Sequence, residues 1–337
     1  MLHHKSHNSF ASRDRPALLG DPCPPSTESS PSLRPDDPAG RAVVSALQTA
    51  VSRIAASDPE VRRGNTEGIH RLRTSIRRLR SELRALEDLV ERSWREQVEG
   101  ELKWLAGMLG GVRDLDILLA RLRQAVPKPE RDSSGAGALA PLFPALEARR
   151  TQAARALNDA LESDRYRSLL ETLKRAAERP ALMDAACVSC RASLPPAAAA
   201  AWRRLKKAAR GLRPSDPDEE FHVLRKRAKR ARYTAELVAP VLRRRAARAA
   251  GRFIRLTTQI QDTLGEHQDA TEATREIRHA LAGHADDPAF VQAAESLLET
   301  QRKSARATRA EFFKIWAKLD RKKLRRWIKP QPKTLSS

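Results

Sequence analysis

The sequence predicts an all-α protein built from tandem duplicated antiparallel four-helix bundles with pseudo-two-fold symmetry. Three observations lead to this prediction. Ala, Leu and Arg dominate the 337 residues, whereas aromatic residues make up only 4% and β-branched residues are sparse. Apolar residues recur at helical spacing from Ala42 onward. One motif occurs twice, once in each half of the chain.

The predicted elements follow from this periodicity and from the residues that interrupt it. Residues 1–39 are rich in Pro, Ser and Asp and predict a disordered tail. In the first half, 40–180, helical patterns cover 42–56, 66–94, 95–125 and 139–177, with a loop at 57–65 and Thr66 as an N-cap. Residues 181–196 form a connector. In the second half, 197–328, the patterns cover 197–210, 218–248, 249–284 and 288–327, and 329–337 form a C-terminal tail.

The charge balance points to a polyanionic partner. The chain carries 64 Lys and Arg against 42 Asp and Glu, a net charge of +22. With 31% charged residues, and without an apolar run of the roughly 20 residues that a membrane-spanning helix needs, it is not expected to insert into a membrane. Three cysteines and an N-terminus without an apolar signal segment predict a cytoplasmic protein.

The repeated motif is a basic helix followed by an LGxxxD segment. The first copy is GIHRLRTSIRRLRSELRAL with LGGVRDLD, and the second is EFHVLRKRAKRARYTAEL with LGEHQDAT. On a helical wheel the basic groups of each helix fall in a stripe about 80° wide beside an apolar stripe. If the halves face each other, both stripes line one groove. The candidate site residues are His70, Arg73, Arg77, Arg80, Arg84, His222, Arg225, Lys229, Arg232 and Tyr233.

These stripes point to an anion because like charges three and four residues apart repel each other. An anion in the groove would relieve that repulsion, and the planar guanidinium group matches phosphate oxygens. The ordinary reading of one basic stripe is a solvated helix face, but two copies headed by histidine favour a site. Gly110 and Gly265 are expected to allow close helix packing. Asp114 and Asp269 either orient a cation of the groove or tie neighbouring helices together.

Nothing in the sequence supports catalysis or a bound cofactor. The chain has no Gly-rich phosphate loop, HExxH motif, paired-carboxylate motif or nucleophile elbow. Cys187 and Cys190 form a single CxxC without a second pair, so no metal site is expected. We therefore expect a protein that is not an enzyme.

The two motifs resemble the CHAD domain family, a family named for conserved histidines in an α-helical domain. The resemblance rests on His70-x-x-Arg73-x-x-x-Arg77-Arg78-x-Arg80 and on His222-x-x-Arg225-x-x-x-Lys229-Arg230-x-Arg232-Tyr233, each followed by its LGxxxD segment, and it covers about residues 40–328. It implies paired helical bundles around a basic groove that binds inorganic polyphosphate, in some members at polyphosphate granules. The chain departs from the pattern at Gln268, where the first copy has Arg113, at Glu236, where it has Arg84, and in the segment 257–263.

The function predicted on these grounds is non-catalytic binding of inorganic polyphosphate, with polyphosphate granules as a candidate target. The alternative is a basic helical protein whose main ligand is nucleic acid. If polyphosphate is the ligand, nucleic acid is expected only as a weak or competing polyanion. The basic segment 321–329 favours this alternative, and the scarcity of aromatic stacking residues argues against it. A third candidate, a phosphatase or kinase of polyphosphate, lacks the carboxylates that such chemistry needs.

Overall fold

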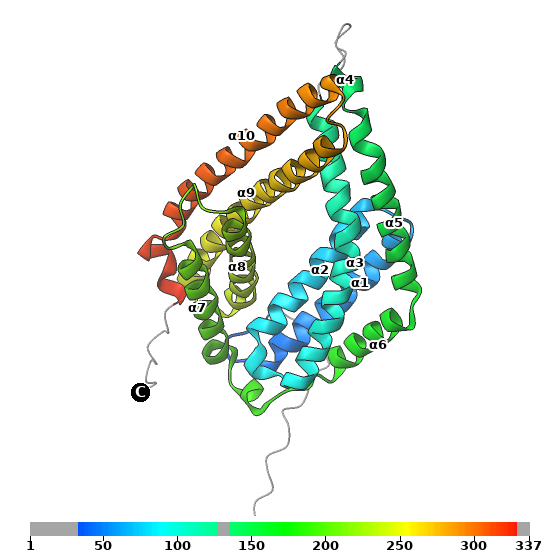
Figure 1. The fold of residues 1–337 in the computed structure, drawn as a ribbon. Coiled ribbons are helices and arrows are strands. Elements are labelled where there is room, and N and C mark those ends of the chain that lie inside the picture. Colours follow the sequence, from blue (N-terminus) through cyan, green and yellow to red (C-terminus); the bar gives the residue numbers. More distant parts are fainter. Residues whose placement is uncertain (1–32, 127–134, 329–337) are drawn as a thin grey trace, which may run out of the picture.

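The regular structure of the protein is helical, as predicted. The computed structural model describes residues 33–126 and 135–328, and within these ranges the only β-type pairing consists of two isolated bridges (Figure 1). Most of the predicted N-terminal tail and all of the segment 329–337 lie outside the described residues. Among those described, no helix is both long and apolar enough to cross a bilayer.

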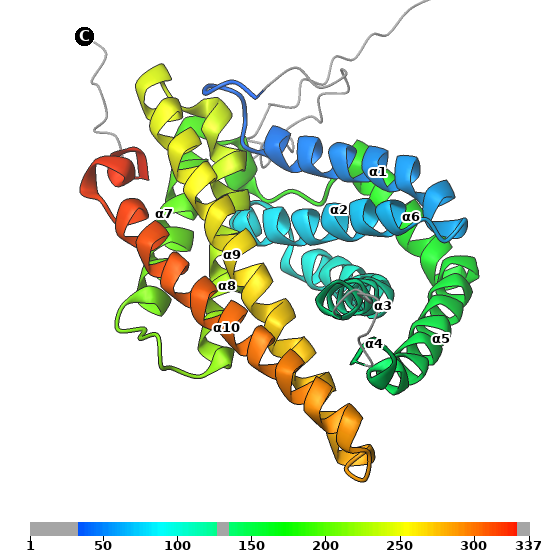
Figure 2. The same cartoon turned by 90° about the horizontal axis from the view of Figure 1, so that it is seen from above.

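The first half is a series of helices that pack successively on one another. α2 packs against α1 and α3, α5 packs on α3, and α6 returns to α1 (Figures 1 and 2). A buried apolar stripe on α2, which includes Leu72, Ile76 and Leu79, faces this core. The helices are α1 (Gly40–Arg62), α2 (Thr66–Ala85), α3 (Arg92–Ala125), the short α4 (Gly135–Ala138), α5 (Phe143–Glu162) and α6 (Asp164–Glu178).

The second half repeats this order of contacts. α8 packs against α7 and α9, and α10 runs along α9. α7 meets α10 where the rings of Trp202 and Trp316 stack with centroids 5.6 Å apart. The helices are α7 (Cys190–Ala209), α8 (Asp218–Val238), α9 (Arg244–Gly283) and α10 (Pro288–Leu319), and the 3₁₀ helix η5 (Lys322–Ile328) packs on α9. Each motif helix is thus the second long helix of its half, while the pseudo-two-fold relation of two bundles stays a prediction.

Two helix contacts between the halves matter most for the site. α2 packs against α8 near the middle of the molecule, and the far ends of α9 and α10 meet the end of α3 at one corner of the fold (Figure 1). The second contact encloses a small core of its own. Its buried members are Leu118, Leu119, Leu122, Leu139, Leu142, Leu146, Ala273, Ile277, Phe290, Ala294, Leu297 and Leu298.

Several predicted boundaries are wrong, and local contacts explain the differences. α1 continues to Arg62 through the predicted loop, because Ser57 and Val61 keep its buried face in register. The N-cap of α2 is Asn65 rather than Thr66: its side chain accepts hydrogen bonds from the backbone N–H groups of Glu67 and Gly68 at 2.9 and 3.0 Å.

Longer predicted helices are divided in the structure. Ser163 separates α5 from α6 and caps α6 by accepting a bond from the Tyr166 N–H at 3.3 Å. The segment 86–91, which includes the short helix Glu87–Leu89, separates α2 from α3. Pro240 lies in the 3₁₀ turn Ala239–Val241 that separates α8 from α9, and the pattern predicted for 288–327 divides after Leu319 into α10 and η5. A proline in a helix interior removes a backbone hydrogen bond.

The predicted tail and connector also differ from the structure, because they bind each other. Residues 33–39 are part of the fold: the N–H of Ala39 donates to Val188, and that of Cys190 donates to Asp37, each at 2.8 Å. α7 begins at Cys190, inside the predicted connector, and includes Pro195 and Pro196. The helix tolerates these prolines because Cys190, Leu194 and Ala198, spaced by four residues, are buried.

The contact at the far ends should contribute strongly to stability. We expect Leu122→Ala to lower the free energy of unfolding by about 2–5 kcal/mol, because Leu122 is fully buried in the small core between the halves. Urea titration measures this change. Leu115→Ala is the matched control, since Leu115 lies only partly buried against the same core. An equal or smaller effect for Leu122→Ala would show that this core does not join the halves.

Candidate anion-binding site

The two motif helices carry their basic residues to the contact between the halves. Both helices start on favourable groups: α2 on the Asn65 cap, and α8 on Asp218, Glu219 and Glu220, whose charges suit the helix N-terminus. Their apolar stripes are buried in one continuous core, and α2 packs on α8 beside their basic edges.

A pocket of about 520 Å³ lies between these edges, and we call it the α2–α8 pocket. Four of its seven cations are predicted site residues, three of them on α2. The remaining three come from α8 and were not predicted. The pocket is lined by Arg77, Arg80, Ser81, Arg84, Val223, Lys226, Arg227, Lys229 and Arg230.

The missed cations flank the predicted stripe on α8, on the edge away from its apolar stripe. Taking His222 as the reference on a helical wheel, Lys226, Arg230 and Arg227 fall at about 40°, 80° and 140°. Lys226 and Arg227 correspond to Thr74 and Ser75 in the first half, so matching the two copies could not find them, whereas Arg230 corresponds to Arg78 but lay outside the predicted stripe. The run of Lys and Arg from 225 to 232 was the available signal. α2 and α8 thus contribute different edges to the pocket.

Positive charge in the α2–α8 pocket is largely uncompensated. Arg84 donates to Glu99 at 2.5 Å, and among the described residues it is the one lining cation with a carboxylate partner. Burial lowers the pKa of Arg77 to about 10, with the neighbouring charge of Arg73 acting in the same direction. Burial, followed by the charges of Arg77 and Arg225, lowers the pKa of Lys229 to about 6. Without a bound anion, the Lys229 side chain is therefore mostly in its neutral amine form at pH 7.

Beside the pocket, each half places an arginine over the glycine of its LGxxxD segment. A Cβ atom on Gly110 would lie 3.7 Å from Nε of Arg73, and one on Gly265 would lie 3.3 Å from Nη2 of Arg225. The glycines thus make room for arginine side chains as well as for the helix backbone.

The aspartates of the same segments act on these arginines. Asp114 of α3 forms an ion pair with Arg73 of α2, with Oδ1 and Nη2 separated by 3.0 Å, a contact that fits both predicted roles, orienting a cation and tying neighbouring helices together. In the second half the charge of Asp269 opposes the lowering of the Arg225 pKa that burial causes. Neither Arg73 nor Arg225 lines the α2–α8 pocket itself.

The two histidines have different neighbours. His222 donates from Nδ1 to Oε1 of Gln268 at 2.8 Å, and burial lowers its pKa although this bond opposes the shift. His70 is exposed, and its pKa is lowered by partial desolvation and then by the charge of Arg113, the counterpart of Gln268. The departure at Gln268 therefore exchanges a repulsive neighbour for a hydrogen-bond acceptor.

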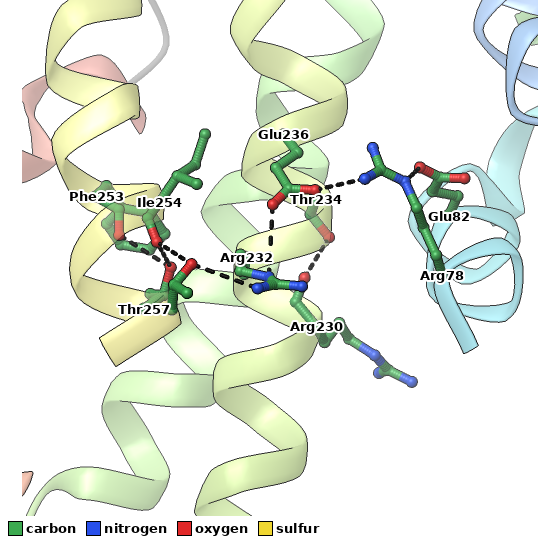
Figure 3. Close-up of polar contacts among 10 residues, drawn as sticks. Arg78, Glu82, Arg230, Arg232, Thr234, Glu236, Phe253, Ile254 and Thr257 are labelled. Atoms are coloured by element: carbon green, nitrogen blue, oxygen red, sulfur yellow. Dashed lines mark hydrogen bonds and ion pairs between the residues drawn. The ribbon is translucent and has the colours of Figure 1, made fainter. Parts of the chain in front are cut away.

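Arg232 and Tyr233, both predicted site residues, take part in a contact network instead of lining the pocket. Glu236 accepts from Arg78 of α2 at 2.8 Å and lies 3.5 Å from Arg232, so it joins the halves (Figure 3). Tyr233 is buried, and the guanidinium carbon of Arg232 lies 4.6 Å from the centre of its ring. The guanidinium group of Arg230 extends away from this network (Figure 3). Glu236 is thus an inter-half partner for arginines.

The cysteines of the CxxC motif are not part of the α2–α8 pocket. Cys190 is buried where α7 begins, and burial raises its pKa to about 11, whereas Cys187 is exposed. Both are free thiols in the structure. Cys23 lies outside the described residues.

Comparisons with known proteins agree on one family. The family model described as CHAD domain matches residues 45–278. Two curated proteins of Mycobacterium tuberculosis, both described as uncharacterized, are 30% identical to the chain over 262 residues, which cover 74% of it and 47% of each relative. The chain therefore spans about half the length of these relatives.

Two solved structures share the fold. PptA from Streptomyces chartreusis matches with a TM-score of 0.69 and 26% identity, over 83% of this chain and 100% of that one. The crystal structure of the CHAD domain from the plant Ricinus communis matches with a TM-score of 0.68 and 23% identity, over 88% and 96%.

The buried amine in the pocket should make stability depend on pH. The pKa of Lys229 is about 6 in the folded chain against its ordinary 10.5, so the unfolded chain binds more protons between these values and stability rises with pH there. We expect Lys229→Met to reduce this slope by up to about 1.4 kcal/mol per pH unit. Urea titrations at pH 6.5, 7.5 and 8.5 measure it. Lys226→Met, which removes an exposed amine of the same helix, should keep the original slope; if both variants behave alike, the desolvation argument for Lys229 fails.

Proposed function

The chain belongs to the CHAD domain family, and on this premise we propose that it binds inorganic polyphosphate in the α2–α8 pocket without chemically changing it. The binding holds the anion between cations contributed by both halves. We place this activity in the cytoplasm, with polyphosphate granules as one location.

The observation that carries the proposal is the uncompensated charge of the pocket. Six of its seven lining cations have no carboxylate partner among the described residues, and burial lowers the pKa of Arg77, Arg80, Lys229 and Arg230. These groups are less stable as cations than they would be in water. An arriving anion reverses that effect, so part of the binding energy comes from relieving the repulsion already present.

The shape and lining of the pocket favour polyphosphate over nucleic acid. Val223 is its one apolar lining residue, and no aromatic side chain lines it, so bases would find no stacking surface. An inorganic phosphate chain presents charge at every phosphate and has no bases to accommodate. The nucleic-acid alternative is best supported elsewhere on the molecule, by the exposed basic segment after α10.

Removing two pocket charges should weaken polyphosphate binding. For the double variant Arg77→Gln and Lys229→Gln we expect a loss of affinity of about 100-fold, because a hydrogen bond to a charged group contributes about 1.5–3 kcal/mol. Calorimetric titration with polyphosphate of defined length, at two salt concentrations, measures the affinity. The dependence on salt should also become shallower, since fewer counterions are released.

The matched control is the double variant Lys174→Gln and Arg175→Gln. Both residues are exposed on α6 and lie outside the α2–α8 pocket, so the control removes at least as much positive charge while the pocket stays intact. Equal losses for the two double variants would contradict the proposed site. Displacement of bound polyphosphate by duplex DNA, but not of DNA by polyphosphate, would favour the nucleic-acid alternative, and release of phosphate by the pure protein with Mg²⁺ would favour an enzyme.

Binding should take up a proton at neutral pH. An anion beside Lys229 favours its charged form, so the amine that is largely neutral in the free pocket becomes protonated on binding. Affinity should therefore be highest below about pH 6 and fall by up to tenfold per pH unit as the pH rises above it. Titration in two buffers of different ionisation enthalpy counts the protons. Long chains are used because their titrating terminal phosphates are few, and Lys229→Gln should abolish this component; an unchanged pH dependence in that variant would contradict the assignment to Lys229.

A further inference from the structure

A second basic pocket is lined by no residue of the repeated motif. It has a volume of about 960 Å³ and is formed by the first turns of α9, the end of α10 and η5. We call it the α9–η5 pocket. It is lined by Arg243, Arg245, Ala246, Arg248, Ala249, Arg252, Arg255, Leu256, Gln259, Lys318, Arg321, Lys323, Leu324, Arg326 and Trp327.

Eight of its nine cations form two groups, and the ninth, Arg243, is the N-cap residue of α9. On α9, Arg245, Arg248, Arg252 and Arg255 follow helical spacing and occupy one edge over about 15 Å, at 1.5 Å per residue. The other group comes from the end of α10 and from the basic segment that follows it. All nine are exposed, and within the described ranges none of them forms an ion pair or has an acidic residue beside it in the lining.

The lining between these cations is apolar, which distinguishes this pocket from the α2–α8 pocket. Ala246, Ala249, Leu256, Leu324 and Trp327 contribute to it, and all but the buried Trp327 are half-buried. The indole N–H of Trp327 is also buried without an acceptor among the described residues. Buried donors of this kind are rare and mark places where water or a ligand completes the structure.

From this combination we infer that the α9–η5 pocket binds a nucleoside polyphosphate. Such a molecule matches both parts of the lining. Its phosphates would pair with the cations, and its flat, largely apolar ring would pack on the surface between them. Inorganic polyphosphate would leave the apolar surface uncovered. The volume lies at the upper end of the range of about 300–1,000 Å³ that holds small molecules. The inference concerns a site separate from the one proposed for polyphosphate.

The test compares two anions that differ by the nucleoside. The full-length chain is titrated with a nucleoside triphosphate and with inorganic tripolyphosphate, in the background of Arg77→Gln and Lys229→Gln so that the α2–α8 pocket contributes little. We expect the nucleoside triphosphate to bind at least tenfold more tightly. Adding Arg248→Glu and Arg252→Glu should weaken it a further tenfold or more, and because both arginines are exposed the fold should persist, which circular dichroism checks.

A second variant tests the contribution of the apolar surface to affinity without changing the charge of the pocket. Leu324→Ser should lower the affinity for the nucleoside triphosphate several-fold. The affinity for tripolyphosphate should not change, because no charge is removed. Lys174→Gln with Arg175→Gln on α6 is the control for net charge and should change neither affinity.

Three outcomes would overturn the inference. Equal affinities for the two anions would mean that the pocket responds to charge alone. Loss of nucleotide binding in the Arg77→Gln and Lys229→Gln background, measured against the original chain, would place the nucleotide in the other pocket. The third outcome is that binding of duplex DNA, or of vesicles with anionic lipid, depends on Arg248 and Arg252 while binding of the nucleoside triphosphate does not. This result would assign the surface to a macromolecule or a membrane. The first and third outcomes leave the polyphosphate proposal standing, because that proposal is tested on the α2–α8 pocket.

Discussion

The contact between α2 and α8 brings two strongly basic helices together, and the surrounding structure compensates for their repulsion at only a few points. Glu236 accepts from Arg78 across the halves at 2.8 Å, and Arg78 also pairs with Glu82 of its own helix at the same distance. Burial lowers the pKa of Arg78, but these two carboxylates raise it further than burial lowers it. Glu236 therefore offsets part of the repulsion where the two basic helices meet.

Apart from Arg84, the cations that line the α2–α8 pocket have no carboxylate partner among the described residues. The arginines with carboxylate partners, Arg73, Arg78 and Arg84, surround a group of cations that have none. Arg77 and Lys229 lie in that group, and burial lowers their pKa values to about 10 and about 6. Buried cations without partners reduce the stability of the free protein, and such a loss is expected where residues are retained for binding. The polyphosphate proposal rests on this division between compensated and uncompensated charge.

The two basic pockets differ in chemistry although both are formed by arginine-rich helices. In the α2–α8 pocket the cations are packed tightly enough to change one another's pKa, and little apolar surface is present. In the α9–η5 pocket the cations are exposed and stand around Leu256, Leu324 and Trp327. The first arrangement suits a ligand that is charged along its whole length. The second suits a ligand with a charged end and an apolar end, so the two proposals assign different phosphorylated compounds to the two pockets.

Much of the fold and part of the site followed from the sequence alone. Periodicity and composition determined the helical class, the motif helices and their basic edges, and pairing of the copies identified Arg77, Arg80, Arg84 and Lys229, because these properties depend on residues within one helix. Tertiary structure decided the rest. The rotation of α8 against α2, set by which face of each helix the core buries, brings Lys226, Arg227 and Arg230 into the pocket and gives Glu236 a partner 158 residues away. Likewise, only packing of distant segments joins the arginines of α9 to those of η5, since no local spacing relates them.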